Sequence, residues 1–199
     1  KSKFFEDRKT MTGKKGISVI SDNNEQPIYL NSKHGPFCLV TSGFIENTEE
    51  LALEMMERGY TFSEVTKGGI NTTELIAKLI IQGSDLIDGI EKMFDKIKGS
   101  CSLLLLNRDG VYAVRDRLGY TPLIVGTRDD ACAVTSETSA FPNNRFKIAK
   151  YLEPGEPLTI EVSYETSRKG EAPTLSLSIL SLEGQSVYAV DLDLPSLGI

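Results

Sequence analysis

Few side chains in this sequence could act as nucleophiles, general bases or metal ligands, and their spacing excludes several kinds of site. The 199 residues contain three cysteines, Cys38, Cys101 and Cys132, and a single histidine, His34. An odd number of cysteines without a CxxC spacing argues against a disulfide framework or a cysteine zinc site. One histidine excludes a multi-histidine metal cage within this chain. Each cysteine lies in an apolar run, where a thiol is usually a small buried hydrophobe, and His34 lies in a KHGP turn that we interpret as solvated.

The composition is that of a globular domain and argues against membrane and nucleic-acid functions. The chain is 40% hydrophobic and 25% charged, with a net charge of −6 and a pI near 5.0. No apolar stretch approaches the roughly 18 residues that a membrane span requires, and the charged first residues lack the apolar centre of a signal peptide. An acidic chain with scattered lysines does not suit nucleic acid. We therefore expect a cytoplasmic protein with reduced thiols.

The pattern of apolar residues predicts an α+β fold. Short runs between residues 16 and 41 (GISVIS, PIYLN and PFCLVT) are typical of strands, as are the runs between residues 101 and 136. The Asp-Gly pair at residues 109–110 indicates a hairpin. Helical patterns occupy the region between the two sets of strands. This order favours antiparallel sheets with helices packed outside them, best described as a four-layer α-β-β-α sandwich.

Three helices are predicted, each with a start signal, an apolar stripe and a nearby glycine. Asn47 and Asn71 are each followed three residues later by glutamate, which is a capping-box pattern, and Asp85 opens the third helix. The stripes consist of Leu51, Ala52, Met55 and Met56, then Leu75, Ile76, Leu79 and Ile80, then Leu86, Ile90, Phe94 and Ile97. The stop signals are Gly59, Gly83 and Gly99. Each helix is expected to bury one face.

The last part of the chain differs in character from the rest. Residues 157–199 are rich in leucine and serine, and the segment TLSLSILSL alternates as a β-hairpin strand does. The final DLDLPSLGI resembles a frayed end. We therefore expect one domain over residues 1–156, followed by a hairpin or divergent tail over 157–199.

Four stretches, in order along the chain, carry a resemblance to a known family. They are EQPIYLNSKHGPFCLVTSGFIEN, INTTELIAKLI, KGSCSLLLLNRDGVYAVRDRLGYTPLIVG, and SETSAF followed by YLEPGE. Together they resemble the class II glutamine amidotransferase domain, the N-terminal-nucleophile hydrolase module of amidophosphoribosyltransferases. The resemblance spans about Gln26 to Glu156. It implies an Ntn-hydrolase sandwich, incomplete at its N-terminus.

The resemblance also implies a catalytic centre that this sequence matches only in part. In the family, a cysteine at the mature N-terminus hydrolyses glutamine, with its own α-amino group as the general base. No residue here corresponds to it, and we interpret Cys38 as a core thiol. The oxyanion-hole asparagine and glycine correspond to Ser42 and Gly43, and the preceding histidine to Thr41. A serine side chain is shorter than that of asparagine, so the site is expected to be degraded.

The groups that hold the charged end of glutamine in the family correspond to weaker matches. The arginine is matched by Arg8 in the segment DRKTMTG, and the aspartate position is occupied by Thr72. Loss of that carboxylate should weaken glutamine binding, because the ammonium group is left unpaired. Asn71, beside it, is either a weak substitute or the N-cap of the following helix.

The strongest matches to the family are residues that shape turns rather than carry chemistry. They are Arg115, Asp116, Gly119, Pro122 and Leu123, then Ser136 and Glu137, and then Pro154, Gly155 and Glu156. Arginine and aspartate side chains at strand ends commonly organise loops through charge-assisted hydrogen bonds. We therefore interpret these residues as architecture.

The resemblance implies partners that lie outside this sequence. No phosphoribosyl-binding motif and no GxxxxGK[ST] loop occurs here, so a transferase domain, with its Mg²⁺, is an expected partner, and this chain itself is expected to hold no cofactor. Glutamine, if the site is active, and a homo-oligomeric copy are further expected partners. Two hypotheses remain open: part of a glutamine-dependent enzyme that supplies ammonia to phosphoribosyl pyrophosphate in purine synthesis, inactive as this chain, or a pseudo-amidotransferase with a structural or regulatory role.

Overall fold

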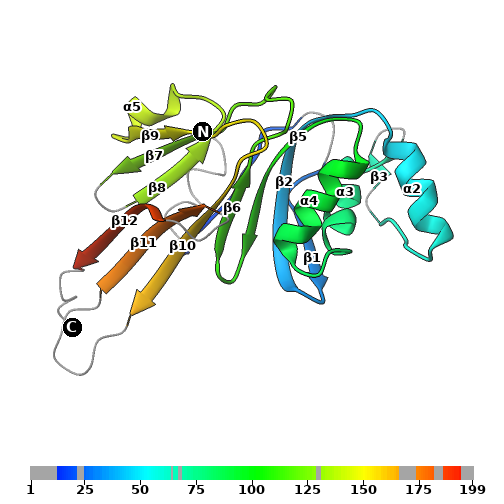
Figure 1. Cartoon of the computed structure of the whole chain (residues 1–199), viewed down its shortest axis with the longest axis horizontal. Coiled ribbons are helices and arrows are strands. Elements are labelled where there is room, and N and C mark those ends of the chain that lie inside the picture. The colour runs from blue at the N-terminus through cyan, green and yellow to red at the C-terminus, as the bar shows by residue number, and fades with distance from the viewer. Residues whose placement is uncertain are drawn as a thin grey trace, which may run out of the picture.

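A seven-stranded antiparallel sheet forms the centre of the fold in a computed structural model (Figure 1). The structure describes residues 13–21, 25–63, 65–66, 69–128, 131–165, 174–181 and 186–193. The strands follow the order β1-β2-β5-β6-β10-β11-β12, and every neighbouring pair is antiparallel. Their bounds are β1 Ile28–Ser32, β2 Gly35–Ile45, β5 Gly99–Asn107, β6 Gly110–Val114, β10 Pro157–Glu165, β11 Thr174–Ser181 and β12 Ser186–Asp193.

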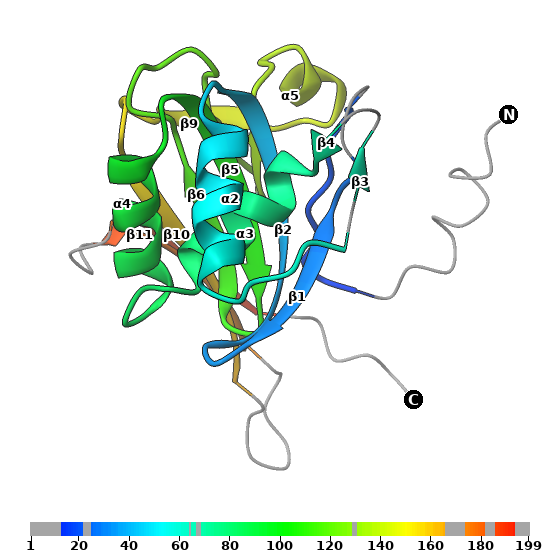
Figure 2. The ribbon, with the colours of Figure 1, turned by 90° about the vertical axis from the view of Figure 1, so that its right-hand side faces the viewer.

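Three helices cover one face of this sheet over β1, β2, β5 and β6 (Figure 2). They are α2 Thr48–Glu57, α3 Thr72–Ile80 and α4 Leu86–Lys96. The main core lies between them and the sheet, and combines the predicted helix stripes with inward residues of the strands, such as Phe37, Leu39 and Leu105. The three predicted helices are therefore confirmed. Met56 is an exception, because it is 43% exposed rather than part of the buried stripe.

The helix start signals are confirmed for two helices and wrong in detail for the third. Asn71 accepts from the N–H groups of Thr73 and Glu74, and Asp85 accepts in the same way from the first turn of α4. Asn47 makes no such cap. Its side chain instead ties the start of α2 to the link between α4 and β5, accepting from the N–H of Lys98 and donating to the carbonyl of Lys96. The backbone of Lys96 and Lys98, far along the chain, therefore binds the Asn47 side chain that the local sequence predicted would cap α2.

The second half of the capping box is also absent at α3. The Glu74 carboxylate accepts from the backbone and hydroxyl of Ser63 and pairs with Lys78 at 2.6 Å. It therefore ties the preceding loop to the helix. Of the glycine stops, Gly59 follows α2 with a positive φ of 89°, while Gly83 and Gly99 lie a few residues beyond the ends of their helices.

A three-stranded sheet packs on the other face of the main sheet. Its order is β8-β7-β9, with bounds β7 Ile124–Arg128, β8 Ala131–Thr135 and β9 Lys147–Tyr151. A second core, built around Ala113, Leu123, Val125 and Leu152, lies between the two sheets. The short helix α5, Ala140–Asn143, places Phe141 against Gly126, where an added Cβ would lie 2.6 Å from the ring. The predicted α+β class with antiparallel sheets and helices outside is confirmed.

Residues 16–21 were expected to be a strand and are not. They form no ladder with any described strand, and Ile20 is fully exposed. The β-branched, apolar composition of this run predicted the strand, but a strand exists only where its backbone pairs with a neighbour, and no described strand pairs with this segment. A separate two-stranded ribbon is present instead at β3 Val65–Thr66 and β4 Gly69–Ile70.

The leucine- and serine-rich part of the chain continues the main sheet. β10 pairs with β6, and β11 lies between β10 and β12. The strand expected from the alternation of TLSLSILSL is present as β11, which pairs on both sides, while the expected fraying is wrong for Asp191–Asp193, which pair with β11. Residues 194–199 lie outside the described residues, and the domain division at residue 157 stays a prediction. Within the described part, no helix is long and apolar enough to cross a membrane.

Candidate glutamine-binding site

An open cavity of about 480 Å³ brings together the positions that the family resemblance singled out. Ser42 and Gly43, near the end of β2, line it together with Thr72, the first residue of α3. Arg8 lies outside the described residues. The other lining residues are Val19, Ile20, Ser21, Gln26, Thr41, Phe44, Ile45, Thr48, Glu49, Gly69, Ile70, Ser100 and Cys101. We refer to this space as the Ser42–Thr72 cavity.

Gly43 is required by the close approach of β2 and β5 at the wall of this cavity. Its φ is +146°, a region that residues with side chains rarely adopt. A Cβ on Gly43 would lie 2.1 Å from the carbonyl oxygen of Ser100 on β5. The position therefore leaves no room for a side chain.

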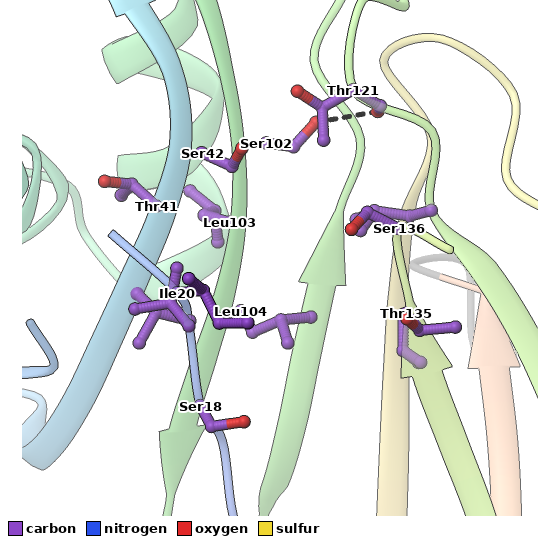
Figure 3. Close-up of a pocket in the computed structure, with 14 residues that line it drawn as sticks. Ser18, Ile20, Thr41, Ser42, Ser102, Leu103, Leu104, Thr121, Thr135 and Ser136 are labelled. Carbon is purple, nitrogen blue, oxygen red and sulfur yellow. Dashed lines mark hydrogen bonds between the residues drawn. The ribbon is translucent and has the colours of Figure 1, made fainter. Parts of the chain in front are cut away.

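A second cavity, of about 300 Å³, lies between the two sheets and meets the first at Thr41 and Ser42 (Figure 3). Hydroxyl groups and aliphatic side chains line it, and none of its described lining residues is charged. The hydroxyls belong to Ser18, Thr41, Ser42, Ser102, Thr121, Thr135 and Ser136. Figure 3 shows Ser42 and Ser102 on neighbouring strands of the main sheet, with Ser136 across the gap. The chamber suits neutral polar groups, because an unpaired ion there would lose its hydration.

A chain of hydrogen bonds positions β2 against α3 at the mouth of the cavity. The side-chain amide of Gln26 both accepts from the N–H of Thr41, at 2.7 Å, and donates to its carbonyl, at 3.2 Å. The Thr41 hydroxyl lies 2.7 Å from that of Thr73. Because Thr41 precedes Ser42 and Thr73 follows Thr72, these hydrogen bonds hold the two cavity-lining residues in place relative to each other. Sequence reasoning missed Gln26 as a site residue, although the Gln-Pro pair was part of the resemblance.

The Asn71 side chain has a structural role and is not available to a ligand. It is fully buried, and its side-chain oxygen caps α3. Its amide nitrogen donates to the carbonyl of Glu25 at 2.8 Å. Both ends of the side chain are therefore engaged, which agrees with the N-cap interpretation.

None of the three cysteines has the features of a nucleophile. Burial raises the pKa of the Cys101 thiol to about 12, and the nearby Asp116 charge adds to the effect. Burial raises the pKa of Cys132 to about 11. Cys38 is half-buried in β2 and lines neither cavity. The expectation that it packs as a core residue is met only in part, because it is not fully buried.

Cys101 should be inert to alkylation although it lines the Ser42–Thr72 cavity. With a pKa of about 12, roughly one thiol in ten thousand is ionised at about pH 8. We expect iodoacetamide to leave Cys101 unmodified in the folded chain and to modify it after denaturation, as measured by peptide mass spectrometry. Rapid modification of the folded chain would show that the thiol is activated.

Arg115 and Asp116 organise the turn that follows β6. The Arg115 guanidinium donates to the carbonyls of Leu152 and Gly119, at 2.6 and 2.9 Å. The Asp116 carboxylate, 1% exposed, accepts from the N–H groups of Tyr120 and Thr121 and from the Ser102 hydroxyl.

These contacts set the ionisation of Asp116. Burial acts to raise the pKa of the Asp116 carboxyl, but the N–H groups of Thr121 and Tyr120 and the Ser102 hydroxyl outweigh it, so that the pKa lies below its ordinary value. Because Ser102 and Thr121 also line the second cavity, the turn residues shape its wall.

The remaining signature residues lie around the same turn or at the cavity rim. Gly119 has a φ of +74° and packs against Pro154, and the N–H of Gly155 donates to the carbonyl of Asp116. Glu156 pairs with Lys150, while Leu123, after Pro122, is buried in the second core. Ser136 lines the second cavity, whereas the N–H of Glu137 donates to Thr135. His34 lies in a turn as expected, but it is half-buried, with Nε2 3.1 Å from the carbonyl of Gly83, so the expectation that it is solvated is met only in part. Sequence reasoning treated Ser136 as architecture, and only the packing of the sheets reveals its place at a cavity.

The described residues offer no cluster of metal-ligating side chains. Nowhere in that part of the chain do three histidine, cysteine, aspartate or glutamate side chains come close enough to share an ion. Among the described lining residues of the two cavities, Glu49 carries the one carboxylate.

Comparison with known proteins agrees with the resemblance. The family described as "Glutamine amidotransferase domain" matches residues 14–143. The chain is similar to the amidophosphoribosyltransferase of Methanocaldococcus jannaschii, with 29% identity over 77% of this chain and 31% of that protein, and to that of Archaeoglobus fulgidus, with 28% identity over 69% and 30%. A glutamine–fructose-6-phosphate aminotransferase of Methanococcus maripaludis is 31% identical over 71% of this chain and 25% of its own length.

Two solved structures share the fold. One, an allosteric regulatory enzyme of purine biosynthesis, has a TM-score of 0.63 and 29% identity, over 69% of this chain and 29% of that one. The other, the B. subtilis glutamine phosphoribosylpyrophosphate amidotransferase, has a TM-score of 0.61 and 25% identity, over 85% and 32%. The chain spans about 30% of the length of the curated amidophosphoribosyltransferases that it matches first. The matched segment includes Ser42 and Gly43 on β2 and the turn after β6, and the chain belongs to the glutamine amidotransferase domain family.

Proposed function

We propose that this chain is the glutamine-binding domain of an amidophosphoribosyltransferase-like amidotransferase and that it has no glutaminase turnover by itself. The observation that carries the proposal is the Ser42–Thr72 cavity, which gathers Ser42, Gly43 and Thr72 from two elements distant in the sequence. These are the positions that the resemblance assigns to the oxyanion hole and to ammonium recognition. The family match and the amidophosphoribosyltransferase relatives support the same function.

The expected lack of turnover follows from the groups that line the cavity. Hydrolysis of a carboxamide needs an activated nucleophile, and the one cysteine among the described lining residues has a pKa near 12. An oxyanion-hole donor contributes about 2.7–4 kcal/mol of transition-state stabilisation. Ser42 can donate one hydrogen bond, but it reaches less far than asparagine. Thr72 offers a hydroxyl where an ammonium group would pair with a carboxylate.

The complete assembly is expected to need parts beyond this domain. In the proposal, a transferase domain with bound Mg²⁺ uses the ammonia to aminate phosphoribosyl pyrophosphate in purine synthesis. A cytoplasmic location, assembly with further copies of the chain, and a complete four-layer α-β-β-α sandwich belong to the same proposal. The acceptor is assigned from the amidophosphoribosyltransferases of Methanocaldococcus jannaschii and Archaeoglobus fulgidus, whose similarity extends over 77% and 69% of this chain.

A pseudo-amidotransferase is the second candidate. The observations that favour it are Ser42 and Thr72 in place of asparagine and aspartate, together with the engagement of Asn71 in the fold. Such a domain would keep the cavity and the turn after β6 while serving a structural or regulatory role.

Glutamate release from glutamine tests the proposed lack of turnover. The purified 199-residue chain should release no glutamate above the background of buffer, measured with glutamate dehydrogenase, while calorimetry should detect weak glutamine binding. The Cys38→Ala variant is the matched control and should behave identically. Turnover that disappears in Cys38→Ala would contradict our assignment of Cys38, and a wild-type chain without any glutamine binding would favour the pseudo-amidotransferase.

A further inference from the structure

The Ser42–Thr72 cavity contains one charged side chain among its described lining residues, that of Glu49. Glu49 lies in the first turn of α2 and is exposed at the cavity mouth. The neighbouring Thr48 hydroxyl donates to the carbonyl of Ile45 at 2.9 Å, which fastens this turn to the end of β2. The first turn of α2, which carries Glu49, therefore lies beside the strand that carries Ser42 and Gly43.

Glu49 differs from the adjacent Glu50 in its position relative to the cavity and in the partner of its carboxylate. Glu50 does not line the cavity, and its carboxylate lies 3.6 Å from the Lys98 ammonium group. In the described part of the chain, Glu49 has no ion-pair or hydrogen-bonding partner for its carboxylate. Both glutamates stabilise α2, because their negative charges lie in its first turn, near the positive end of the helix dipole. Because both glutamates interact with the helix dipole, that interaction does not explain why Glu49 lines the cavity and Glu50 does not.

An amino acid with a free α-ammonium group supplies the missing counter-charge. The rest of the described lining is neutral, and Thr72 can offer a hydroxyl but no charge. We propose that Glu49 pairs with the α-ammonium group of an amino acid held in the Ser42–Thr72 cavity, and that this residue selects ligands with a free amine. The inference rests on the proposed glutamine-binding function and deepens it.

The geometry also assigns the two ends of the ligand. With the ammonium group at Glu49, the carboxamide extends toward Ser42, where the first cavity meets the uncharged, hydroxyl-lined chamber. A neutral carboxamide can hydrogen-bond to hydroxyls there, while a carboxylate would lose its hydration without gaining a counter-ion. The same arrangement therefore disfavours glutamate in place of glutamine.

Calorimetry with two ligands that differ in the amine tests this assignment. The probes are L-glutamine and 4-carbamoylbutanoate, which keeps the carboxamide and the α-carboxylate but has no amino group. The Glu49→Gln variant of the full chain should bind glutamine about threefold to fivefold more weakly than wild type, the upper part of the range expected for an exposed ion pair. Its affinity for 4-carbamoylbutanoate should change by less than about twofold. The glutamine effect should shrink at high salt, which screens exposed charges.

Glu50→Gln is the matched control, because it removes the same charge from the same helical turn. It should leave both affinities within about twofold of wild type. Equal glutamine binding by wild type and Glu49→Gln would overturn the assignment while leaving the proposed function intact. Equal weakening of both probes, or equal effects of Glu49→Gln and Glu50→Gln, would also overturn it. Absence of glutamine binding in the wild type would overturn the proposed function and this inference together.

Discussion

Replacing Asp116 with alanine is expected to lower the free energy of unfolding by about 3–5 kcal/mol. The carboxylate is buried and accepts from the N–H groups of Tyr120 and Thr121 and from the Ser102 hydroxyl. Alanine leaves these donors without the acceptor that the folded turn provides. Guanidinium unfolding followed by circular dichroism measures the loss. A change below about 1 kcal/mol would show that the turn after β6 reorganises without this carboxylate.

The pH dependence separates the charge of Asp116 from its shape. Because its pKa in the folded chain lies below the ordinary value, the stabilisation is present above about pH 4, and it is lost as the pH falls through the folded pKa. The Asp116→Asn variant keeps the size and one acceptor oxygen but cannot titrate. We expect its stability to fall less than that of wild type on acidification below about pH 4. Parallel curves for the two proteins would contradict the assignment of a depressed pKa.

Replacing Gly43 with alanine is expected to lower the free energy of unfolding by about 3 kcal/mol or more and to distort the Ser42–Thr72 cavity. Two effects combine there. The φ of +146° disfavours any side chain, and the added Cβ would lie 2.1 Å from the Ser100 carbonyl oxygen, far inside van der Waals contact. Denaturant unfolding measures the stability, and glutamine calorimetry of the folded fraction reports on the cavity.

Gly35→Ala is the control for the conformational part of this effect. Gly35 also has a positive φ, 87°, but an added Cβ there would meet no atom within 4 Å. The Gly35→Ala substitution should lower the free energy of unfolding by only about 1 kcal/mol. If the two variants lost the same stability, the close approach of β2 and β5 at Gly43 would not be the cause.

The secondary structure could be predicted well where its signals are local. The caps at Asn71 and Asp85 and the hairpin at residues 109–110 each depend on residues a few positions apart. The prediction failed at Asn47 because residues at the far end of α4 compete for its side chain. It failed at residues 16–21, which have the composition of a strand but pair with no described strand.

By itself, the sequence determined the family, the three main helices between two sets of strands, and the unusual residues at Ser42 and Thr72, since motifs and periodicity are properties of neighbouring residues. Only the tertiary structure decided that Ser42, Gly43, Thr72, Gln26 and Glu49 line one cavity. It also decided that Ser102, Thr121 and Ser136 line a second, uncharged one. These groups come from strands, helices and loops that meet only when β2 pairs with β5, the helices cover one face of the sheet, and the small sheet packs on the other. Such long-range packing leaves no local signal in the sequence.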